Sequence, residues 1–173
     1  MNRSMSFSGF CSLAVAGLLF MILSGCGVYK LRDISIPQDV KSVKVNFIEN
    51  RAPYINPQLS PRLTDRLRQK IVTQTRLTQT NNDSADWVIN GTVTNYSIST
   101  AGLTNGTQAT NRLTVTVHIV KVDQVLDKTT EYDVSRPFDF RSDQSITQAE
   151  AGLLEDILKS MTDDIFNRLF SDW

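Results

Sequence analysis

The residue with the most specific chemistry in this chain is Cys26, which ends the sequence Leu23-Ser24-Gly25-Cys26. The small Ser24 and Gly25 let the backbone enter a protease site, and the Cys26 thiol is a nucleophile for lipid attachment. The four residues are similar to a bacterial lipobox, in which the cysteine is acylated and begins the mature chain. We therefore predict a diacylglycerol on the Cys26 thiol, an N-acyl chain such as palmitate on its amine, and no other cofactor. Each buried CH₂ contributes about 0.8 kcal/mol, so two or three chains anchor a protein stably.

The residues before Cys26 have the pattern of a secretory signal peptide. Arg3 is their only charged residue, and it precedes an apolar stretch from Phe10 to Leu23. A helix of that length rises about 21 Å, less than the ~30 Å of a bilayer's hydrocarbon core, so a spanning anchor is not expected. We predict a signal peptide over residues 1–25, followed by a lipidated tether over residues 26–38.

The residues near the predicted cleavage site also bear on location and redox chemistry. Gly27 follows Cys26, in place of the aspartate that retains many lipoproteins in the inner membrane, and this favours an outer-membrane lipoprotein facing the periplasm. Cys11 is the only other cysteine. It would leave with the signal peptide, so we expect no disulfide, free thiol or cysteine-based metal site in the mature chain.

The rest of the composition argues against nucleic-acid binding and catalysis. The chain has 18 Lys+Arg and 18 Asp+Glu, whereas binding to phosphate backbones requires a basic excess. His118, the one histidine, would need a carboxylate and a nucleophile converging on it to act in catalysis. We predict instead that His118 makes a cross-strand hydrogen bond, and we expect neither a metal site nor enzymatic activity.

Basic residues gather in the first predicted helix, where Arg62, Arg66 and Arg76 fall on one flank of the apolar stripe at 100° per residue. One hypothesis is a site for anionic sugar phosphates, because arginine binds phosphate oxygens bidentately. The alternative is that this basic helix complements the acidic last helix. Spacing alone leaves both interpretations open.

Two predicted loops could provide contacts with a partner, because scaffolds commonly present such residues on loops. The loop over residues 50–57 contains two prolines together with Arg51 and Tyr54, so it can present a cation and an aromatic ring rigidly. The loop over residues 100–111 is rich in Thr, Asn and Gly and includes Leu103 and Asn105. We expect both loops to be candidate contact surfaces.

Periodicity predicts the elements that position these residues. Val43, Val45 and Phe47 alternate with polar residues, as in a half-buried strand. Leu63, Leu67 and Ile71 form one stripe of a helix that runs to about residue 76. The predicted cap of that helix is Ser60, with Pro61 as its first helical residue. Further strands are expected over 86–99, 113–119 and 129–140, and a last helix follows a capping box at Ser145 and Gln148 or at Thr147 and Glu150.

This order predicts an α+β fold of the type β-α-β-β-β-α over residues 39–173. We expect a two-layer sandwich in which two helices pack on one face of a mostly antiparallel, four-stranded sheet.

Several motifs occur in an order that resembles one protein family, the LptE family of lipopolysaccharide-assembly lipoproteins. The similarity is to its divergent branch with an ENRAP-like segment, and it covers nearly the whole mature chain. The motifs are Gly25–Tyr29, Ile36-Pro37, Phe47–Pro53, Asn56–Ser60, Asn111–Val117, Phe138–Phe140 and Phe166–Trp173.

The resemblance implies a function and two partners. LptE-type proteins plug the large β-barrel of LptD, assist its folding and help lipopolysaccharide reach the outer leaflet. A domain inside a barrel needs a polar surface, which the threonines of the predicted strands would supply, although threonine is also simply a good strand residue. The open alternative is a lipoprotein subunit of another envelope transport or secretion complex. The threonines are Thr92, Thr94, Thr114 and Thr116.

Overall fold

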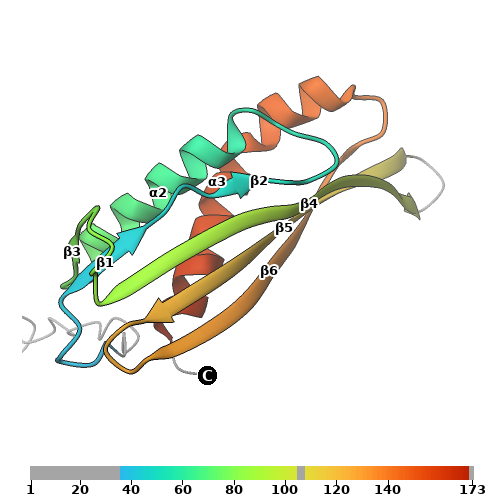
Figure 1. The fold of residues 1–173 in the computed structure, drawn as a ribbon. Coiled ribbons are helices and arrows are strands. Elements are labelled where there is room, and N and C mark those ends of the chain that lie inside the picture. The colour runs from blue at the N-terminus through green and yellow to red at the C-terminus, as the bar shows by residue number, and fades with distance from the viewer. Residues whose placement is uncertain (1–35, 105–107, 172–173) are drawn as a thin grey trace, which may run out of the picture. The chain divides into compact units, whose positions relative to one another are not determined.

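A mixed sheet of six strands and two helices forms in the described part of the chain, residues 36–104 and 108–171 of a computed structural model (Figure 1). Contacts divide the chain into residues 1–33 and residues 34–173, and every described residue belongs to the second unit. The predicted signal peptide, the lipid attachment site Cys26 and most of the predicted tether therefore lie outside the described residues.

The sheet has the strand order β3-β1-β4-β5-β6, and β2 pairs with β4. The helices are α2 (Leu59–Gln74) and α3 (Ile146–Phe170), and both lie on one face of the sheet (Figure 1). The strands are β1 (Ser42–Val45), β2 (Glu49–Asn50), β3 (Thr78–Gln79), β4 (Trp87–Thr104), β5 (Gln108–Asp123) and β6 (Lys128–Arg141).

The α+β class and the two helices agree with the sequence prediction, but the mostly antiparallel, four-stranded sheet is wrong. β1 pairs in parallel with both β3 and β4, and β2 pairs in parallel with β4. Parallel strands need a crossover connection, and here α2 carries the chain from the end of β2 back to the start of β3. The two additional strands, β2 and β3, have two residues each, which is too short to produce an alternating pattern.

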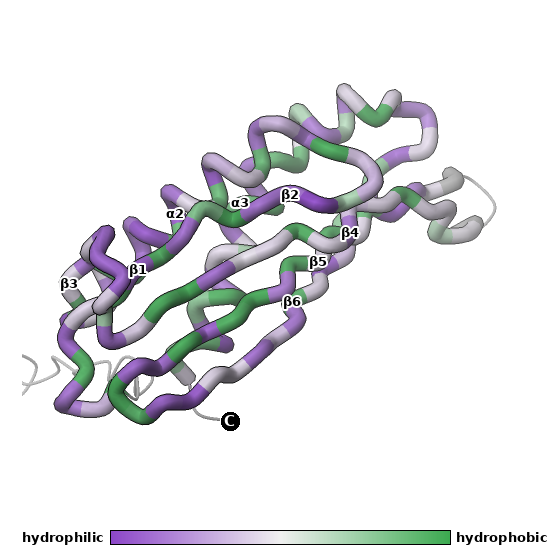
Figure 2. Tube along the Cα trace, in the orientation of Figure 1, coloured by the Kyte–Doolittle hydropathy of each residue, from purple (hydrophilic) through white to green (hydrophobic). Residues whose placement is uncertain are grey.

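The core lies between the sheet and the helices. The predicted stripe of α2, Leu63, Leu67 and Ile71, is fully buried. The apolar residues of β4 and β5 alternate with polar ones, as the hydropathy colouring shows (Figure 2). Their inward side chains join the helices in one cluster, to which α3 contributes Ile157, Leu158, Met161 and Ile165.

The two helices differ in how well their starts were predicted. The capping box of α3 is confirmed: Ser145 Oγ accepts from Gln148 N at 3.3 Å, and Gln148 Oε1 accepts from Ser145 N at 3.1 Å. The predicted cap of α2 at Ser60 is wrong, because α2 begins at Leu59. Asn56 Oδ1 accepts a hydrogen bond from Gln58 N at 2.9 Å, and this turn starts the helix earlier.

The predicted loop over residues 100–111 is mostly strand. β4 continues to Thr104 and β5 starts at Gln108, so the two form a long hairpin. The pairing register shifts between Val93 and Asn95 and again between Thr100 and Leu103. Gly102 has a φ of 96° at the second shift, in the region that glycine adopts without steric cost.

Phe47 is a further correction. The alternation places it with Val43 and Val45, but β1 ends at Val45, and pairing with β4 resumes only at Glu49 with the register shifted by one residue. As a result Ile48 is buried and the Phe47 side chain is 53% exposed.

Candidate functional site

The face of the sheet opposite the helices is polar over much of its length, with Val88, Val120 and Val122 at the end near the β5–β6 turn. It carries Thr92, Thr114 and Thr116, each partly exposed, and Thr94, which is exposed. Thr116 lies opposite Ser135 of β6, and the two hydroxyl oxygens are 2.9 Å apart. This surface, which we call the open face, therefore offers hydroxyl donors and acceptors.

Charged pairs on the open face join β5 to β6. Arg112 donates to both carboxylate oxygens of Asp139, at 2.7 and 2.9 Å. The hydrogen bonds from Arg112 lower the pKa of Asp139 below its ordinary value. Cross-strand pairs of this kind stabilise a sheet that has one solvated face.

The prediction of a cross-strand hydrogen bond for His118 is confirmed. His118 Nδ1 lies 2.9 Å from Asp133 Oδ1 on the neighbouring strand, and its Nε2 lies 3.7 Å from Glu131 Oε2. In the described part of the chain, the polar partners of the ring are these two carboxylates, and no hydroxyl or thiol hydrogen-bonds to it. Within residues 36–104 and 108–171, no group of three or more His, Cys, Asp or Glu side chains could hold a metal ion.

Of the three arginines predicted to form a basic flank on the first helix, two lie together and the third lies elsewhere. Arg62 and Arg66 both donate to the carboxylate of Glu155 on α3, and these bonds lower the pKa of Glu155. Arg76 lies beyond the end of α2 and donates to the carbonyl oxygens of Ile36 and Pro37 instead, at 2.9 and 2.6 Å.

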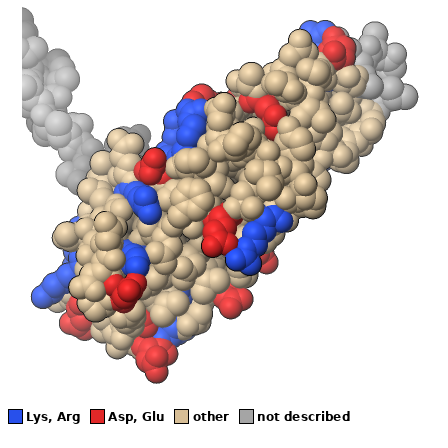
Figure 3. Space-filling view, turned by 45° about the horizontal axis from the view of Figure 1, so that its top comes forward, with Lys and Arg blue, Asp and Glu red and all other residues tan. Residues whose placement is uncertain are grey.

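The contacts between the helices agree with the interpretation that they complement each other in charge. Besides the pairs with Glu155, Lys70 of α2 binds Asp163 of α3. On the face displayed in Figure 3, charged side chains of both signs are scattered among neutral ones, without a continuous basic surface. Arg62 and Arg66 remain partly exposed, so their contact with anions stays a prediction.

A pocket of about 390 Å³ lies between the starts of α2 and α3. Asn56, Arg62, Glu150 and Glu155 are among its lining residues. Oε1 of Glu150 is buried without a hydrogen-bond partner in the described structure. Pro57, Ala151 and Leu154 also line the pocket, so its wall combines apolar side chains with two carboxylates and one guanidinium.

The loop over residues 50–57 presents the side chains predicted for it. Arg51 is exposed and donates to Glu49 Oε2 at 2.9 Å. The Tyr54 ring stacks on the ring of Tyr96 with centroids 5.6 Å apart, and its hydroxyl donates to Glu150 Oε2 at 3.2 Å. Tyr54 thus connects this loop to β4 and α3.

Tyr96 is a residue that the sequence interpretation missed. It is buried, and burial, more than the nearby carboxylate of Glu150, raises its pKa. The register shift after Val93 moves Tyr96 to the inner face, whereas strict alternation from Trp87 would leave it on the outer face. Glu155, the partner of two arginines, was also missed as a contact residue. The feature of the sequence that could have indicated Glu155 is the opposite net charge of the two helices.

Three predicted residues cannot be placed as contacts. Leu103 lies within β4, while Asn105 and Cys26 lie outside the described residues. Neither described helix has the length and apolar character needed to cross a membrane.

Comparisons with known proteins provide independent information. A family model described as LptE, lipopolysaccharide-assembly, matches residues 40–169. A comparison with curated proteins gives no match.

Solved structures show the same fold at low sequence identity. A minor lipoprotein from Acinetobacter baumannii has a TM-score of 0.50 and 15% identity, over 76% of this chain and 93% of that one. A protein from Xanthomonas campestris has a TM-score of 0.50 and 15% identity, over 80% and 89%. A putative neuraminyllactose-binding hemagglutinin homolog from Helicobacter pylori has a TM-score of 0.50 and 8% identity, over 82% and 86%. These similarities concern the fold alone.

Proposed function

The chain belongs to the LptE family of lipopolysaccharide-assembly proteins, and from this premise we propose that it is a lipid-anchored plug and assembly partner of an LptD-type β-barrel. The match over residues 40–169 carries the proposal, because it spans nearly all of the described structure. In this proposal Cys26 bears a diacylglycerol and an N-acyl chain that hold the protein at the outer membrane, facing the periplasm. The protein performs no catalysis and helps lipopolysaccharide reach the outer leaflet.

The open face of the sheet supports this role. The lumen of a large outer-membrane barrel is polar, so a domain enclosed by it needs hydrogen-bonding groups on its surface. Thr114, Thr116 and Ser135 provide hydroxyls on adjacent strands of this face. We propose that the open face lies against the barrel wall, with the helices turned away from the wall.

Co-purification from detergent-solubilised outer membranes tests the proposal. We expect a stoichiometric complex of this protein with an LptD-like barrel. Recovery of the protein at normal membrane levels without such a barrel would contradict the proposal and favour a subunit of another envelope complex.

Paired variants test which face binds the barrel. Thr114→Lys with Thr116→Lys adds two charges and two long side chains to the open face, so we expect recovery of the barrel to fall. Gln69→Lys with Thr73→Lys makes the same change at exposed positions of α2, and recovery should be retained. Loss of the complex in the second pair alone would place the contact on the helices instead.

Lipid attachment is tested separately. The mass of the mature polypeptide should show acylation at Cys26 and removal of residues 1–25. An unmodified sulfur at that position, or fractionation into the cytosol, would exclude the proposed anchor.

A further inference from the structure

Two adjacent apolar side chains stand exposed at the turn between β5 and β6. Leu126 is 64% exposed, and it is the most exposed of the large apolar side chains in the described part of the chain. Its neighbour Val125 is 44% exposed. The turn is coloured hydrophobic at the end of the hairpin (Figure 2). Neighbouring apolar side chains on a tight turn bury little surface within their own domain, so an external apolar partner would be needed to cover them.

The turn is held in place rather than free to fold back. Asp123 Oδ1 accepts hydrogen bonds from the backbone N–H groups of Val125 and Leu126, both at 3.0 Å. Its Oδ2 accepts from the buried indole of Trp87 at 2.8 Å. Asp127 follows with a φ of 49°, in the left-handed region. These contacts fix the backbone in the conformation that presents both apolar side chains.

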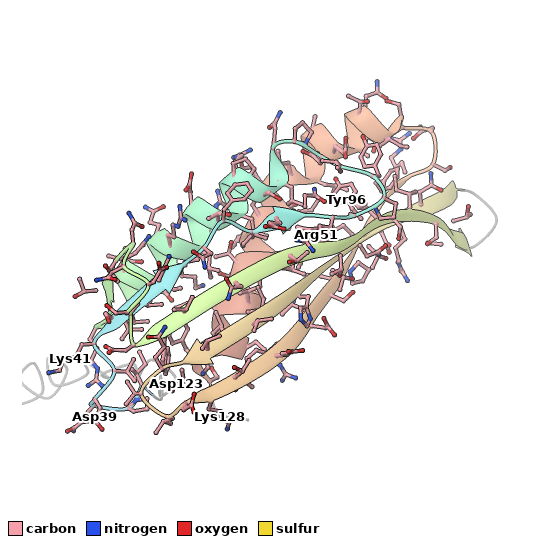
Figure 4. All side chains as sticks on the ribbon, in the orientation of Figure 1. Asp39, Lys41, Arg51, Tyr96, Asp123 and Lys128 are labelled. Atoms are coloured by element: carbon pink, nitrogen blue, oxygen red, sulfur yellow. The ribbon has the colours of Figure 1, made fainter. Side chains whose placement is uncertain are left out.

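The turn lies at the end of the domain where the chain enters from its N-terminal segment. Gln124 N donates to Asp86 O at 2.8 Å. The carboxylate of Asp86 accepts from the backbone N–H groups of Lys41 and Ser42, also at 2.8 Å. One residue therefore connects the turn to the start of β1. The labelled residues Asp39, Lys41, Asp123 and Lys128 gather at this end (Figure 4).

The chain length to the predicted anchor is short. Ile36, the first described residue, is ten residues after Cys26. Ten residues span at most about 33–36 Å when fully extended, so the acyl chains proposed above keep this end of the domain close to the bilayer surface. This step rests on the proposed acylation of Cys26.

The charges near the β5–β6 turn indicate whether electrostatic attraction or burial of apolar surface would drive its contact with a membrane. The charged residues near the turn and the chain entry have no basic excess. They comprise Lys41, Lys44 and Lys128 together with Asp39, Asp83, Asp86, Asp123 and Asp127. Such a surface gains little from anionic headgroups, and burial of apolar surface remains as the driving force.

We propose that the β5–β6 turn inserts Val125 and Leu126 into the headgroup and acyl boundary of the leaflet that holds the lipid anchor. The anchor brings the turn to the surface, and the turn fixes which end of the domain faces the lipid. Before the barrel encloses the domain, this contact restricts the rotation that the lipidated tether alone would allow.

Site-specific labelling tests this contact. The acylated chain has no free thiol if Cys26 is modified, so Leu126→Cys introduces one position for an environment-sensitive dye. Ile55→Cys is the matched control, because Ile55 is 57% exposed but lies in the loop before α2. Each labelled full-length protein is reconstituted in phosphatidylethanolamine–phosphatidylglycerol vesicles, with and without brominated acyl chains.

We expect the dye at position 126 to shift to shorter wavelength in vesicles and to lose intensity with brominated chains. The dye at position 55 should do neither, and Val125→Ser should reduce both changes at position 126. Raising the phosphatidylglycerol content should leave the shift unchanged. Dye emission at position 126 that matches position 55 would overturn the proposal.

Two further outcomes separate this proposal from others. An apolar shift at position 126 that appears only when the barrel is added would assign the turn to the barrel and overturn the lipid contact. Labelling of the parent protein, which has only Cys11 and Cys26, would show a free thiol and contradict the acylation. In that case the vesicle experiment still tests the turn. The quenching measured for the labelled parent is subtracted from the quenching of the labelled Leu126→Cys protein.

Discussion

The indole Nε1 of Trp87 donates a 2.8 Å hydrogen bond to Oδ2 of Asp123, and both residues are buried where β4 and β5 pair at the end of the sheet. The other oxygen of Asp123 accepts two backbone hydrogen bonds from the β5–β6 turn. A single carboxylate thus ties the core to an exposed turn.

Removing that carboxylate should destabilise the domain. Asp123→Ala leaves the indole N–H without a partner and frees two backbone N–H groups, so we expect a loss of about 2–4 kcal/mol in the free energy of unfolding. Asp123→Asn keeps one acceptor for the turn but points an amide donor at the indole, and should cost less than alanine. Urea denaturation with an unchanged m-value measures both. Equal stability of Asp123→Ala and the parent would contradict this role.

Gly91 should tolerate no side chain without cost. A Cβ there would lie 2.9 Å from Cγ1 of Ile48 and 3.2 Å from Cδ1 of Ile119. We expect Gly91→Ala to lower the free energy of unfolding by about 1–3 kcal/mol through overpacking. Combined with Ile48→Ala, its cost should be smaller than in the parent, because the nearest clashing atom, Cγ1 of Ile48, is gone. Additive costs in this double-mutant cycle would argue against the clash.

The hydroxyl of Tyr96 should contribute nothing to stability. It is buried beside Glu150 and Asn56, and in the described structure it has no hydrogen-bond partner. We therefore expect Tyr96→Phe to be neutral or to stabilise the domain by up to about 1 kcal/mol. Tyr96→Ala also removes the stack with Tyr54 and should cost about 3–5 kcal/mol, as for other large aromatic residues. A marked loss in Tyr96→Phe would show that the hydroxyl has a partner.

Acid should weaken the connection between β1 and β4. Hydrogen bonds from the Lys41 and Ser42 backbones lower the pKa of Asp86 below its ordinary value of 3.8. A lowered folded pKa contributes stability above the unfolded pKa, and this contribution is lost as pH falls through the folded pKa. The free energy of unfolding should therefore decrease below about pH 4, and less steeply in Asp86→Asn.

Denaturation curves between neutral and acid pH measure this dependence. The matched control is Asp156→Asn. Asp156 is an exposed residue of α3, and its carboxylate makes no hydrogen bond within the described structure. It should leave the pH dependence as in the parent. If Asp86→Asn and the parent lost the same stability at acid pH, Asp86 would not be a source of the pH dependence.

Arg62 and Arg66 provide the test of anion contact. Arg62→Gln with Arg66→Gln should reduce lipopolysaccharide binding in vitro while the thermal midpoint stays close to that of the parent, because exposed ion pairs add little stability. Arg141→Gln removes an exposed arginine that pairs with Asp143 in the segment between β6 and α3 and not with a residue of either helix. Lipopolysaccharide binding should persist in this variant. Unchanged binding in the first variant would leave the pairing with Glu155 as the role of both arginines.

Much of the fold could be predicted from residues with strong local signals. The Ser145 and Gln148 pair marks the start of α3 because both side chains act within one turn. The alternation from Leu113 to Ile119 marks β5 because one face is buried and the other is not. Among the described strands, β6 pairs with β5 alone, through an unbroken register, and is an edge strand.

Local sequence patterns could not predict the parallel pairing of the strands. Whether β1 lies beside β4 depends on how α2 returns the chain, and no residue of β1 encodes that path. Tyr96 shows the same limit for the site, because a register shift two residues earlier decides which face it occupies. The pairing of Arg62 and Arg66 with Glu155 joins residues about 90 positions apart, so only the charge of the two helices could hint at it.

The parallel pairing of β1 with β4 has a consequence for the order of folding. β4, β5 and β6 follow one another along the chain and join through short turns, so their contacts close small loops and can form quickly. β1 reaches β4 only across about 44 residues, including all of α2. We therefore expect the N-terminal strand, although synthesised first, to join the sheet late, together with β3, which pairs with it. Until it arrives, one side of β4 remains open to other chains.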